Sequence, residues 1–348
     1  MDMPLQPKKL LILNILEILK RHTNVDHPIT QKKIMEYLEQ DYGMAAERKA
    51  VKRNLAELME AGYPVRVKSE KVRGTGDDEN IACSDFYYEH DFTDAELRLL
   101  IDSVLFSRSI PHRQGKELIR KLEDLTDENF SYRVDHVRSL PENRPENKQL
   151  FYTIEILNEA ISKKKQVELV HSNYGTDLKP HPAADENGNI KKQVINPYQI
   201  VAANGRFYLI CNNDRYDNII HYRLDRITDI RLLKTPVKPI RSLPEAKAGL
   251  DLPKHMAEHV YMFPGKAKRV TFRAKKYLMN DLVDWFGTDL FISDETEDEI
   301  TVSVTVNLNA MRLWALQYAL HVRVLEPESL REQLKEDVHR AAENYDNH

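Results

Sequence analysis

The chain has 348 residues, of which 41% are hydrophobic and 30% are charged. This length exceeds the roughly 100–200 residues of a typical domain, so we expect two or three domains with separate cores. The composition excludes a disordered chain, and the sequence has neither an apolar run near the roughly 20 residues that span a bilayer nor a signal-peptide pattern at its start, so we expect a cytoplasmic protein with no membrane contact.

Charge is distributed unevenly along the chain. Residues 1–73 contain 14 Lys and Arg against 10 Asp and Glu, whereas the remainder contains 37 against 45, within an overall formal charge of −4. A positive segment followed by a negative remainder suggests that the N-terminal module binds a polyanion.

Three helices and a hairpin are predicted at the start of the chain. Apolar residues recur at helical spacing over 10–19, a second helix is expected to begin after Thr30 as its N-cap, and a third is expected over 45–61. Apolar residues then recur at every second position on both sides of a turn at 74–78, which is the spacing of β-strands. This order predicts a winged helix-turn-helix DNA-binding domain over residues 1–90.

The third helix has a basic face opposite its apolar stripe. At about 100° per residue, Val51, Leu55 and Leu58 share one side, and Lys and Arg residues take the other. Basic side chains there suit DNA phosphates and base edges in the major groove, and those of the hairpin suit phosphates. A solvated helix face would have the same pattern, and the hairpin is what favours DNA. The predicted DNA-binding residues are Arg48, Lys49, Lys52, Arg53, Arg66 and Lys68.

The next part of the chain is predicted to be a helical linker. Helical patterns return between 92 and 125, and Thr93 is the expected N-cap of the first helix. A polar segment with two prolines at 140–147 then indicates a boundary. We therefore expect the linker to cover residues 91–147.

Residues 148–240 are predicted to form a small β domain. After one helix at 149–162, apolar residues recur at every second position, which predicts strands. Turns with Asp, Asn and Gly separate these short strands. The strands are centred on 167–170, 193–201, 206–211 and 219–224. Short strands at such close spacing are typical of a small barrel.

Three motifs of this β domain resemble the WYL-domain family of bacterial transcriptional regulators. They are Asn196-Pro197-Tyr198-Gln199-Ile200-Val201, Gly205-Arg206-Phe207-Tyr208-Leu209-Ile210 and His221-Tyr222-Arg223-Leu224-Asp225-Arg226-Ile227. The triplet that names the family is Phe207-Tyr208-Leu209 here, so phenylalanine replaces tryptophan. Segment 48–55 of the third helix also resembles the family, and the resemblance extends over most of the chain.

The resemblance implies an SH3-like or Sm-like β-barrel whose groove senses nucleic acid or a nucleotide-like anion. The ligand-binding residues that it implies are Tyr174, Tyr208, His221, Arg223 and Arg226. Guanidinium groups bind phosphate bidentately and aromatic rings stack on bases, so these residue types suit such a ligand. The alternative is structural, with the aromatic rings filling the barrel and Asp225 pairing with a neighbouring arginine. The chain departs from the family at His171, where relatives often have a tyrosine.

Residues 260–348 are predicted to form a ferredoxin-like domain. Prolines between 236 and 253 indicate a linker, after which the pattern reads strand, helix, two strands, helix, strand and helix. This unit is similar to the C-terminal extension of WYL-domain regulators, which implies a role in oligomerisation or ligand capture. Trp285 and Trp314 are expected in its core rather than in a stacking site.

The sequence has no pattern typical of an enzyme. G-x-S-x-G, H-E-x-x-H and a phosphate-binding loop are all absent from it. Cys83 and Cys211 are far apart and lack a CxxC or Cys/His neighbour, so we expect ordinary buried thiols rather than a disulfide, a zinc site or a nucleophile. We therefore expect no catalytic activity, no cofactor and no metal.

These patterns together predict an α+β multidomain protein that acts as a ligand-responsive, DNA-binding transcriptional regulator. Its expected partners are double-stranded DNA and a nucleic-acid or nucleotide effector, and paired half-sites favour a homodimer. The alternative function is a non-enzymatic adaptor whose barrel binds a protein or RNA partner. An adaptor would have no need of the basic face on the third helix.

Overall fold

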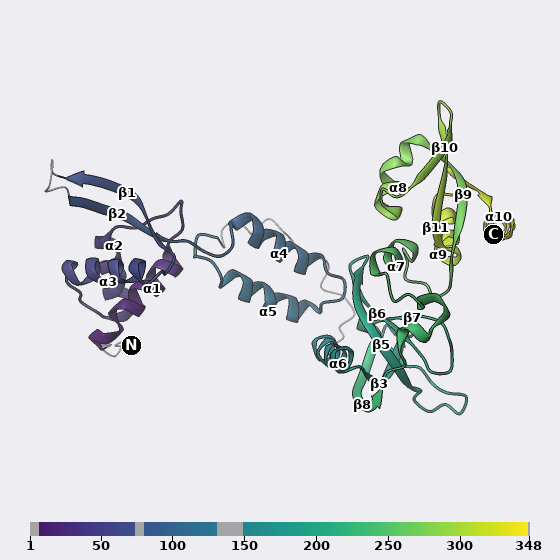
Figure 1. Ribbon diagram of the computed structural model, residues 1–348, viewed down its shortest axis with the longest axis horizontal. Coiled ribbons are helices and arrows are strands. Elements are labelled where there is room, and N and C mark those ends of the chain that lie inside the picture. The colour runs from purple at the N-terminus through teal and green to yellow at the C-terminus, as the bar shows by residue number, and fades with distance from the viewer. Residues whose placement is uncertain (1–6, 74–79, 131–148, 347–348) are drawn as a thin grey trace. The chain divides into compact units, whose positions relative to one another are not determined.

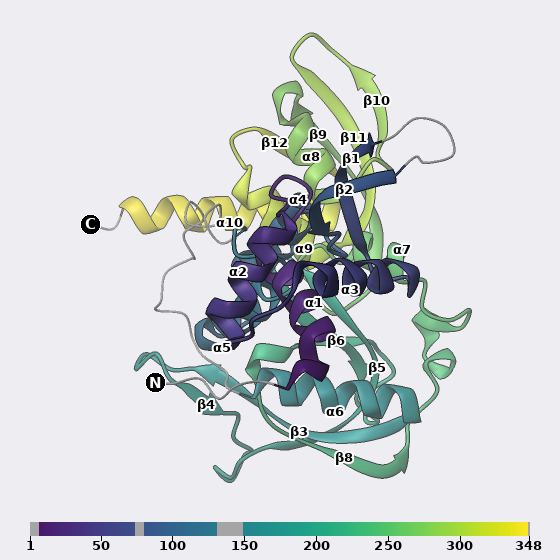
Figure 2. The same ribbon diagram turned by 90° about the vertical axis from the view of Figure 1, so that its left-hand side faces the viewer.

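The computed structural model describes residues 7–73, 80–130 and 149–346, and Figures 1 and 2 show it from two directions. The chain divides into two compact units, Met1–Arg144 and Pro145–His348. Among the described helices, none combines the length and the apolar character that crossing a bilayer requires.

The first unit begins with three helices and a two-stranded antiparallel hairpin (Figure 1). Their bounds are η1 (Lys8–Leu10), α1 (Leu11–His22), α2 (Gln31–Tyr42), α3 (Arg48–Glu60), β1 (Val65–Arg73) and β2 (Asn80–Tyr88). Ile15, Leu38 and Leu55 are almost completely buried where the helices meet Phe86 of β2. The predicted helices and strands are therefore present, and the predicted turn at 74–78 lies outside the described residues.

Local chemistry sets the ends of these helices. The Thr30 side chain caps α2 by accepting a hydrogen bond from the Lys33 amide, and Gly43 ends the helix with a φ of 60°, where glycine has no steric penalty. The third helix begins at Arg48, three residues later than predicted. Met44 is buried in the core, which holds the segment before Arg48 outside the helix.

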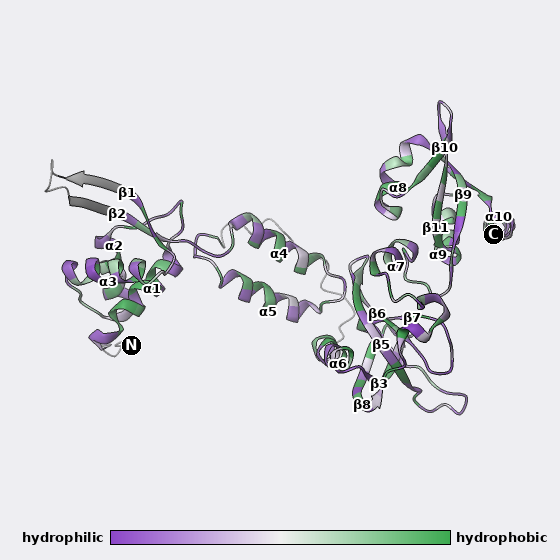
Figure 3. Ribbon diagram, in the orientation of Figure 1, coloured by the Kyte–Doolittle hydropathy of each residue, from purple (hydrophilic) through white to green (hydrophobic). Residues whose placement is uncertain are grey.

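Two helices, α4 (Asp94–Phe106) and α5 (His112–Glu123), follow in the first unit, and both carry hydrophobic and hydrophilic residues (Figure 3). Thr93 caps α4 through a reciprocal pair with Glu96, as the sequence predicts for the cap. The helices pack through Leu97 and Ile101, and Asn24 Nδ2 donates to Asp127 Oδ2 at 2.8 Å to join them to the first three helices. The predicted boundary at 140–147 lies outside the described residues.

The second unit begins with α6 (Leu150–Lys163) and a six-stranded antiparallel sheet. The strands are β3 (Lys165–Tyr174), β4 (Pro180–Pro182), β5 (Lys192–Ala203), β6 (Arg206–Asn212), β7 (Ile220–Arg223) and β8 (Ile227–Pro236). Their order is β4-β3-β5-β6-β7, and β8 also pairs with β3. In the part of the chain that the structure describes, no ladder joins β7 to β8, so the predicted barrel is not closed. The short turn η4 (Leu224–Arg226), with Leu224 fully buried, takes the chain from β7 to β8 instead.

The segment predicted as a proline-rich linker is ordered and partly buried. It contains η5 (Ile240–Ser242), η6 (Pro244–Ala246) and α7 (Leu252–Glu258). Leu243 and Met262 pack into one hydrophobic cluster with Ile210 of the sheet. Asp251 caps α7 and Pro253 lies in its first turn, where the missing N–H breaks no helical hydrogen bond. The prolines therefore begin helical turns here instead of loosening the chain.

The rest of the second unit has the predicted order of strands and helices. It contains β9 (Ala267–Lys275), η7 (Lys276–Leu278), α8 (Met279–Phe286), β10 (Phe291–Glu295), β11 (Glu299–Asn307), α9 (Leu308–Gln317), β12 (Val322–Glu326) and α10 (Glu328–Asp346). The strands form an antiparallel sheet in the order β10-β11-β9-β12. Trp314 is fully buried beside Phe272 and Phe286, and Trp285 is partly buried at the same core, in agreement with the prediction.

Candidate functional sites

The basic residues predicted on the third helix lie together on the exposed face of α3. The buried face of α3 carries Val51, Leu55 and Leu58, each at most 3% exposed. Because this stripe fixes the rotation of the helix, the opposite side is presented to solvent. The exposed basic residues on that side are Lys49, Lys52 and Arg53, and Arg48 is exposed at the edge of this face.

Two of these side chains have weak contacts inside the chain. Arg48 Nε is 3.4 Å from Gln31 Oε1, and Arg53 Nε is 3.6 Å from Glu57 Oε1. Solvent-exposed contacts of this kind contribute little to stability, so a phosphate can replace them. The first two turns of α3 therefore form a compact cationic surface.

The predicted hairpin residues are exposed but are engaged within the chain. Arg66 Nη2 forms an ion pair with Glu89 Oε2 at 2.9 Å, and Lys68 Nζ donates to the Val25 carbonyl at 2.9 Å. Contact with DNA would require both groups to exchange these partners. Arg66 and Lys68 are therefore less available to a phosphate than the basic residues of α3.

Three of the five predicted ligand residues meet at the ends of β3 and β7. The Arg226 guanidinium lies over the Tyr174 ring, with Cζ 4.2 Å from the ring centroid. Arg223 binds Asp225 bidentately, with Nε 3.0 Å from Oδ1 and Nη2 2.6 Å from Oδ2. The pairing of Asp225 with an arginine, given above as the structural alternative, is thus present at Arg223.

The pKa directions of the two arginines differ. Hydrogen bonding to Asp225 raises the pKa of Arg223. Burial, followed by the nearby charge of Arg223, lowers the pKa of Arg226. Arg226 therefore lies where positive charge is only partly compensated, and an anion placed beside it would relieve this repulsion.

Two further residues belong to this cluster, and the sequence did not place them there. Arg206 of β6 is near enough for its charge to lower the pKa of Arg226, and its Nε is buried with no hydrogen-bond partner in the described residues. Burial, and then the charge of Arg226, lowers the pKa of His171. Side chains alternate between the two faces of a strand, so Arg206 shares a face of β6 with Tyr208, which is opposite Arg223 in the register. This alternation could have placed Arg206 near Arg223 from the sequence. We call Arg206, Arg223, Arg226, Tyr174 and His171 the arginine cluster.

The other two predicted ligand residues differ in position. Tyr208 borders the arginine cluster as the register partner of Arg223, but it is only 9% exposed and belongs to the hydrophobic cluster that contains Ile210, which fits the structural alternative. His221 faces α7, where its Nε2 is 2.8 Å from His255 Nε2. Neither side chain is directed at the arginines by any hydrogen bond of the described residues.

Metal and thiol chemistry receive no support from the described side chains. Among them, no three His, Cys, Asp or Glu residues are arranged to hold a metal ion. Cys211 is a free, buried thiol, and burial raises its pKa, which disfavours the reactive thiolate. The Cys83 side chain lies outside the described residues.

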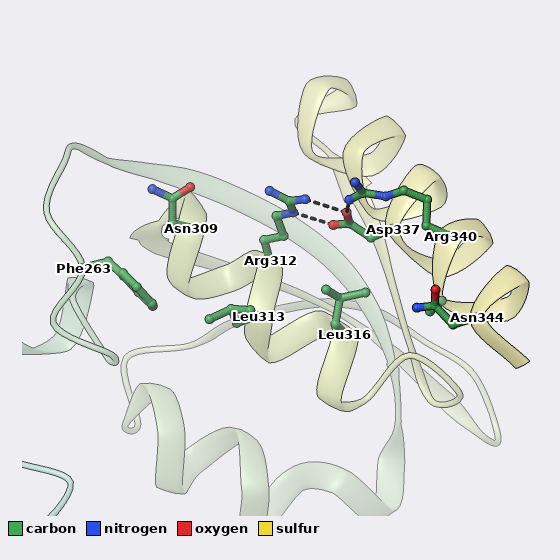
Figure 4. Close-up of a pocket in the computed structure, with 9 residues that line it drawn as sticks. Phe263, Asn309, Arg312, Leu313, Leu316, Asp337, Arg340 and Asn344 are labelled. Carbon is green, nitrogen blue, oxygen red and sulfur yellow. Dashed lines mark hydrogen bonds and ion pairs between the residues drawn. The ribbon is translucent and has the colours of Figure 1, made fainter. Parts of the chain in front are cut away.

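A cleft of about 710 Å³ lies between α9 and α10 (Figure 4). One side has the apolar residues Leu313 and Leu316, and at the other Asp337 binds both Arg312 and Arg340. Hydrogen bonds from these arginines lower the pKa of Asp337 to about 2. The arginines are thus engaged in attaching α10 to α9, and we assign this ion-pair network to the stability of the domain.

Two domain families match the sequence of the second unit. The WYL domain matches residues 152–232, and the WCX domain matches residues 266–342. No curated protein matches the chain.

Solved structures show only distant likeness to the whole chain. The first is proteasome accessory factor B/C (PafBC) of Arthrobacter aurescens, with 16% identity and a TM-score of 0.29, over 99% of this chain and 50% of that one. The second is a CRISPR Cas-related protein, with 12% identity and a TM-score of 0.39, over 97% of this chain and 84% of that one. The chain therefore spans half of the PafBC chain.

Proposed function

We propose that this chain, which carries a WYL domain and a WCX domain, is a DNA-binding transcriptional regulator that responds to an anionic effector. In this proposal the first three helices and the hairpin form a winged helix-turn-helix domain. The six-stranded sheet is the effector domain, built like a small open barrel, and the C-terminal sheet is ferredoxin-like. The proposal assigns the chain no catalytic activity and no cofactor.

One observation carries the DNA-binding proposal, namely the four exposed basic side chains opposite the buried stripe of α3. Lys49 and Lys52 have no ion-pair partner among the residues that the structure describes. An α-helix fits the major groove, where such side chains reach guanine edges and phosphates. A single recognition helix contacts few base pairs, so we propose a homodimer that reads two half-sites.

The arginine cluster supports an anionic effector with an aromatic or planar part. Arg206 has a buried Nε that lacks an acceptor within the described part of the chain, and Arg226 is held over the Tyr174 ring. A phosphate can accept hydrogen bonds from both guanidinium groups, and a base can stack on the tyrosine. The effector changes DNA binding only if it binds one arrangement of the chain more tightly than another.

Charge reversal on α3 tests the DNA-binding proposal. The double variant Lys52→Glu/Arg53→Glu is expected to bind a duplex at least about 100-fold more weakly than the wild type, because it loses two phosphate contacts and gains repulsion. The salt slope of any remaining binding should fall by about 2. Binding is measured by fluorescence anisotropy of a labelled duplex in 50–200 mM salt.

A matched control separates the effect of α3 from that of net charge. Lys191→Glu/Lys335→Glu changes the charge equally at two exposed positions of the second unit, and it should bind DNA like the wild type. Equal loss of binding in both double variants would contradict the assignment of α3 as the recognition helix. Circular dichroism should show the same helix content in all three proteins, since every changed side chain is exposed.

A further inference from the structure

Three histidines outside the arginine cluster meet between β7 and α7. His221 Nε2 is 2.8 Å from His255 Nε2, and the His255 and His259 rings are stacked with their centroids 4.1 Å apart. The His259 centroid is 5.4 Å from that of His221. His255 and His259 are only 9% and 6% exposed. We call these three residues the histidine cluster.

His255 and His259 of the histidine cluster lie on a connector, residues 252–265, which is attached at one side to the WYL sheet that carries His221. Besides the His221–His255 contact, Asn204 Nδ2 donates to the Val260 carbonyl at 2.7 Å. Met262 of the connector is buried in the hydrophobic cluster of the sheet. Polar and apolar contacts therefore hold the connector on β6 and β7.

The same connector is attached to the WCX domain at its other end. His259 Nε2 lies 3.0 Å from the Gly265 carbonyl, to which Asn307 Nδ2 also donates at 3.2 Å. The Asn307 side chain also accepts a hydrogen bond from the Ala310 amide, at the start of α9. Hydrogen bonds thus run from β7 through the histidine cluster to the first turn of α9.

The histidine cluster has hydrogen-bond acceptors for one added proton. His259 Nδ1 lies 2.9 Å from the His255 carbonyl, and its Nε2 faces the Gly265 carbonyl. A neutral imidazole donates from one nitrogen only, whereas an imidazolium donates from both, so one proton can be accommodated here.

A second proton is disfavoured on the His221–His255 pair. Their Nε2–Nε2 contact needs one donor and one acceptor, so protonating the acceptor would set two N–H groups against each other at 2.8 Å. Protonating His221 at Nδ1 instead would bury a charge at an atom with no hydrogen-bond partner in the described part of the chain, and the nearby Met262 backbone offsets only a small part of this cost. Burial, and then the neighbouring histidines, lowers the pKa of His221 to about 3. Burial, and then His259, lowers that of His255 to about 4.

Charged groups on the surrounding elements are engaged elsewhere. On α7, Lys254 Nζ is 3.9 Å from Glu258 Oε1, and the Glu245 carboxylate of η6 accepts from the Ile219 amide. On the WYL sheet, Arg223 of β7 binds Asp225, and the neutral Cys211 thiol of β6 donates to the Ile220 carbonyl. On the WCX sheet, which α7 also contacts, Arg269 of β9 lies over the Phe291 ring. Among the described residues, no carboxylate has a hydrogen bond or ion pair with the histidine cluster.

We propose that the histidine cluster is a proton-sensitive clasp that holds the connector on the WYL sheet when neutral or singly protonated and releases it on further protonation. Release breaks the hydrogen-bonded route from β7 to α9. This inference concerns the joint between the WYL and WCX domains and depends on neither DNA nor an effector.

Hydrogen exchange of the full chain at pH 7.5 and pH 5.5, corrected for intrinsic exchange rates, tests the clasp. A histidine that is released has the ordinary pKa of about 6.5, so at pH 5.5 it is mostly protonated in the released state. Protonation of each of His221 and His255 should therefore shift the equilibrium towards release of the connector about tenfold. Protection of residues 252–265 in the wild type should therefore fall about 100-fold between the two pH values.

Glutamine variants give a graded comparison, since a glutamine amide keeps a hydrogen bond but cannot take up a proton at these pH values. His221→Gln and His255→Gln should each lose protection only about tenfold on acidification, and the double variant should lose none. His339→Gln, at an exposed position of α10, is the control and should respond like the wild type.

Two results would overturn the clasp. The first is unchanged protection of residues 252–265 in the wild type at pH 5.5. The second is a loss of protection in the double glutamine variant that is as large as the loss in the wild type. Because the readout uses no DNA, either result would leave the proposed function untouched, and loss of the DNA-binding proposal would leave the clasp untouched.

Discussion

At the scale of single residues, neighbouring arginines have different tasks. Arg223 is fixed by two hydrogen bonds to Asp225, whereas Arg226 lies over the Tyr174 ring and Arg206 has a buried Nε with no acceptor among the residues that the structure describes. The first arginine closes the turn after β7, and the other two are available to an anion. The motif that contains Arg223 and Arg226 reveals both residues but does not distinguish their roles, because roles depend on which side chain reaches the carboxylate.

Alanine substitution separates these roles by stability. Arg223→Ala leaves the mostly buried Asp225 carboxylate without its bidentate partner and should lower the free energy of unfolding by about 1–3 kcal/mol. Arg226→Ala removes only an aromatic contact and should cost about 0.5–1 kcal/mol. Urea denaturation followed by circular dichroism measures both. A larger loss for Arg226→Ala than for Arg223→Ala would reverse the assignment of structural and ligand-binding arginines.

At the scale of helices and strands, hydrophobic periodicity was enough to predict most elements. The buried stripe of α3 follows the predicted spacing, and Thr30 and Thr93 cap the helices that they were expected to cap. The start of α3 was wrong by three residues because burial of Met44, a tertiary contact, overrides helix propensity. The prediction of a proline-rich linker was wrong, because prolines suit first helical turns as well as linkers and only the packing of Leu243 and Met262 decides between them.

The capping box of α4 gives a prediction at this scale. Thr93→Ala removes the acceptor for the Glu96 amide and should lower the free energy of unfolding of the first unit by about 1 kcal/mol. Ser103→Ala is the control on the same helix: the Ser103 hydroxyl donates to the exposed Leu99 carbonyl, and its loss should change stability by less than about 0.5 kcal/mol. Thermal unfolding of both variants measures the difference, and equal effects would show that the cap contributes nothing specific.

At the scale of the whole molecule, the sequence patterns predict the order of strands and helices better than they predict how sheets close. The WYL and WCX matches fall inside the predicted domains 148–240 and 260–348. The barrel did not follow from strand count, because closure requires a ladder between the end strands, and η4 turns the chain between β7 and β8 instead. The histidine cluster could not be predicted, because it brings together residues from a strand and from a segment that sequence patterns assign to a linker.

Binding of the full chain to the DNA upstream of its own coding region, at two salt concentrations and with excess competitor DNA, tests the central claim most directly. A regulator that reads sequence through α3 should give saturable binding that survives the competitor and weakens steeply with salt, because each phosphate contact releases counterions. Two chains per fragment would agree with the homodimer. Binding that the competitor removes completely, or no binding at either salt concentration, would contradict the claim and favour an adaptor.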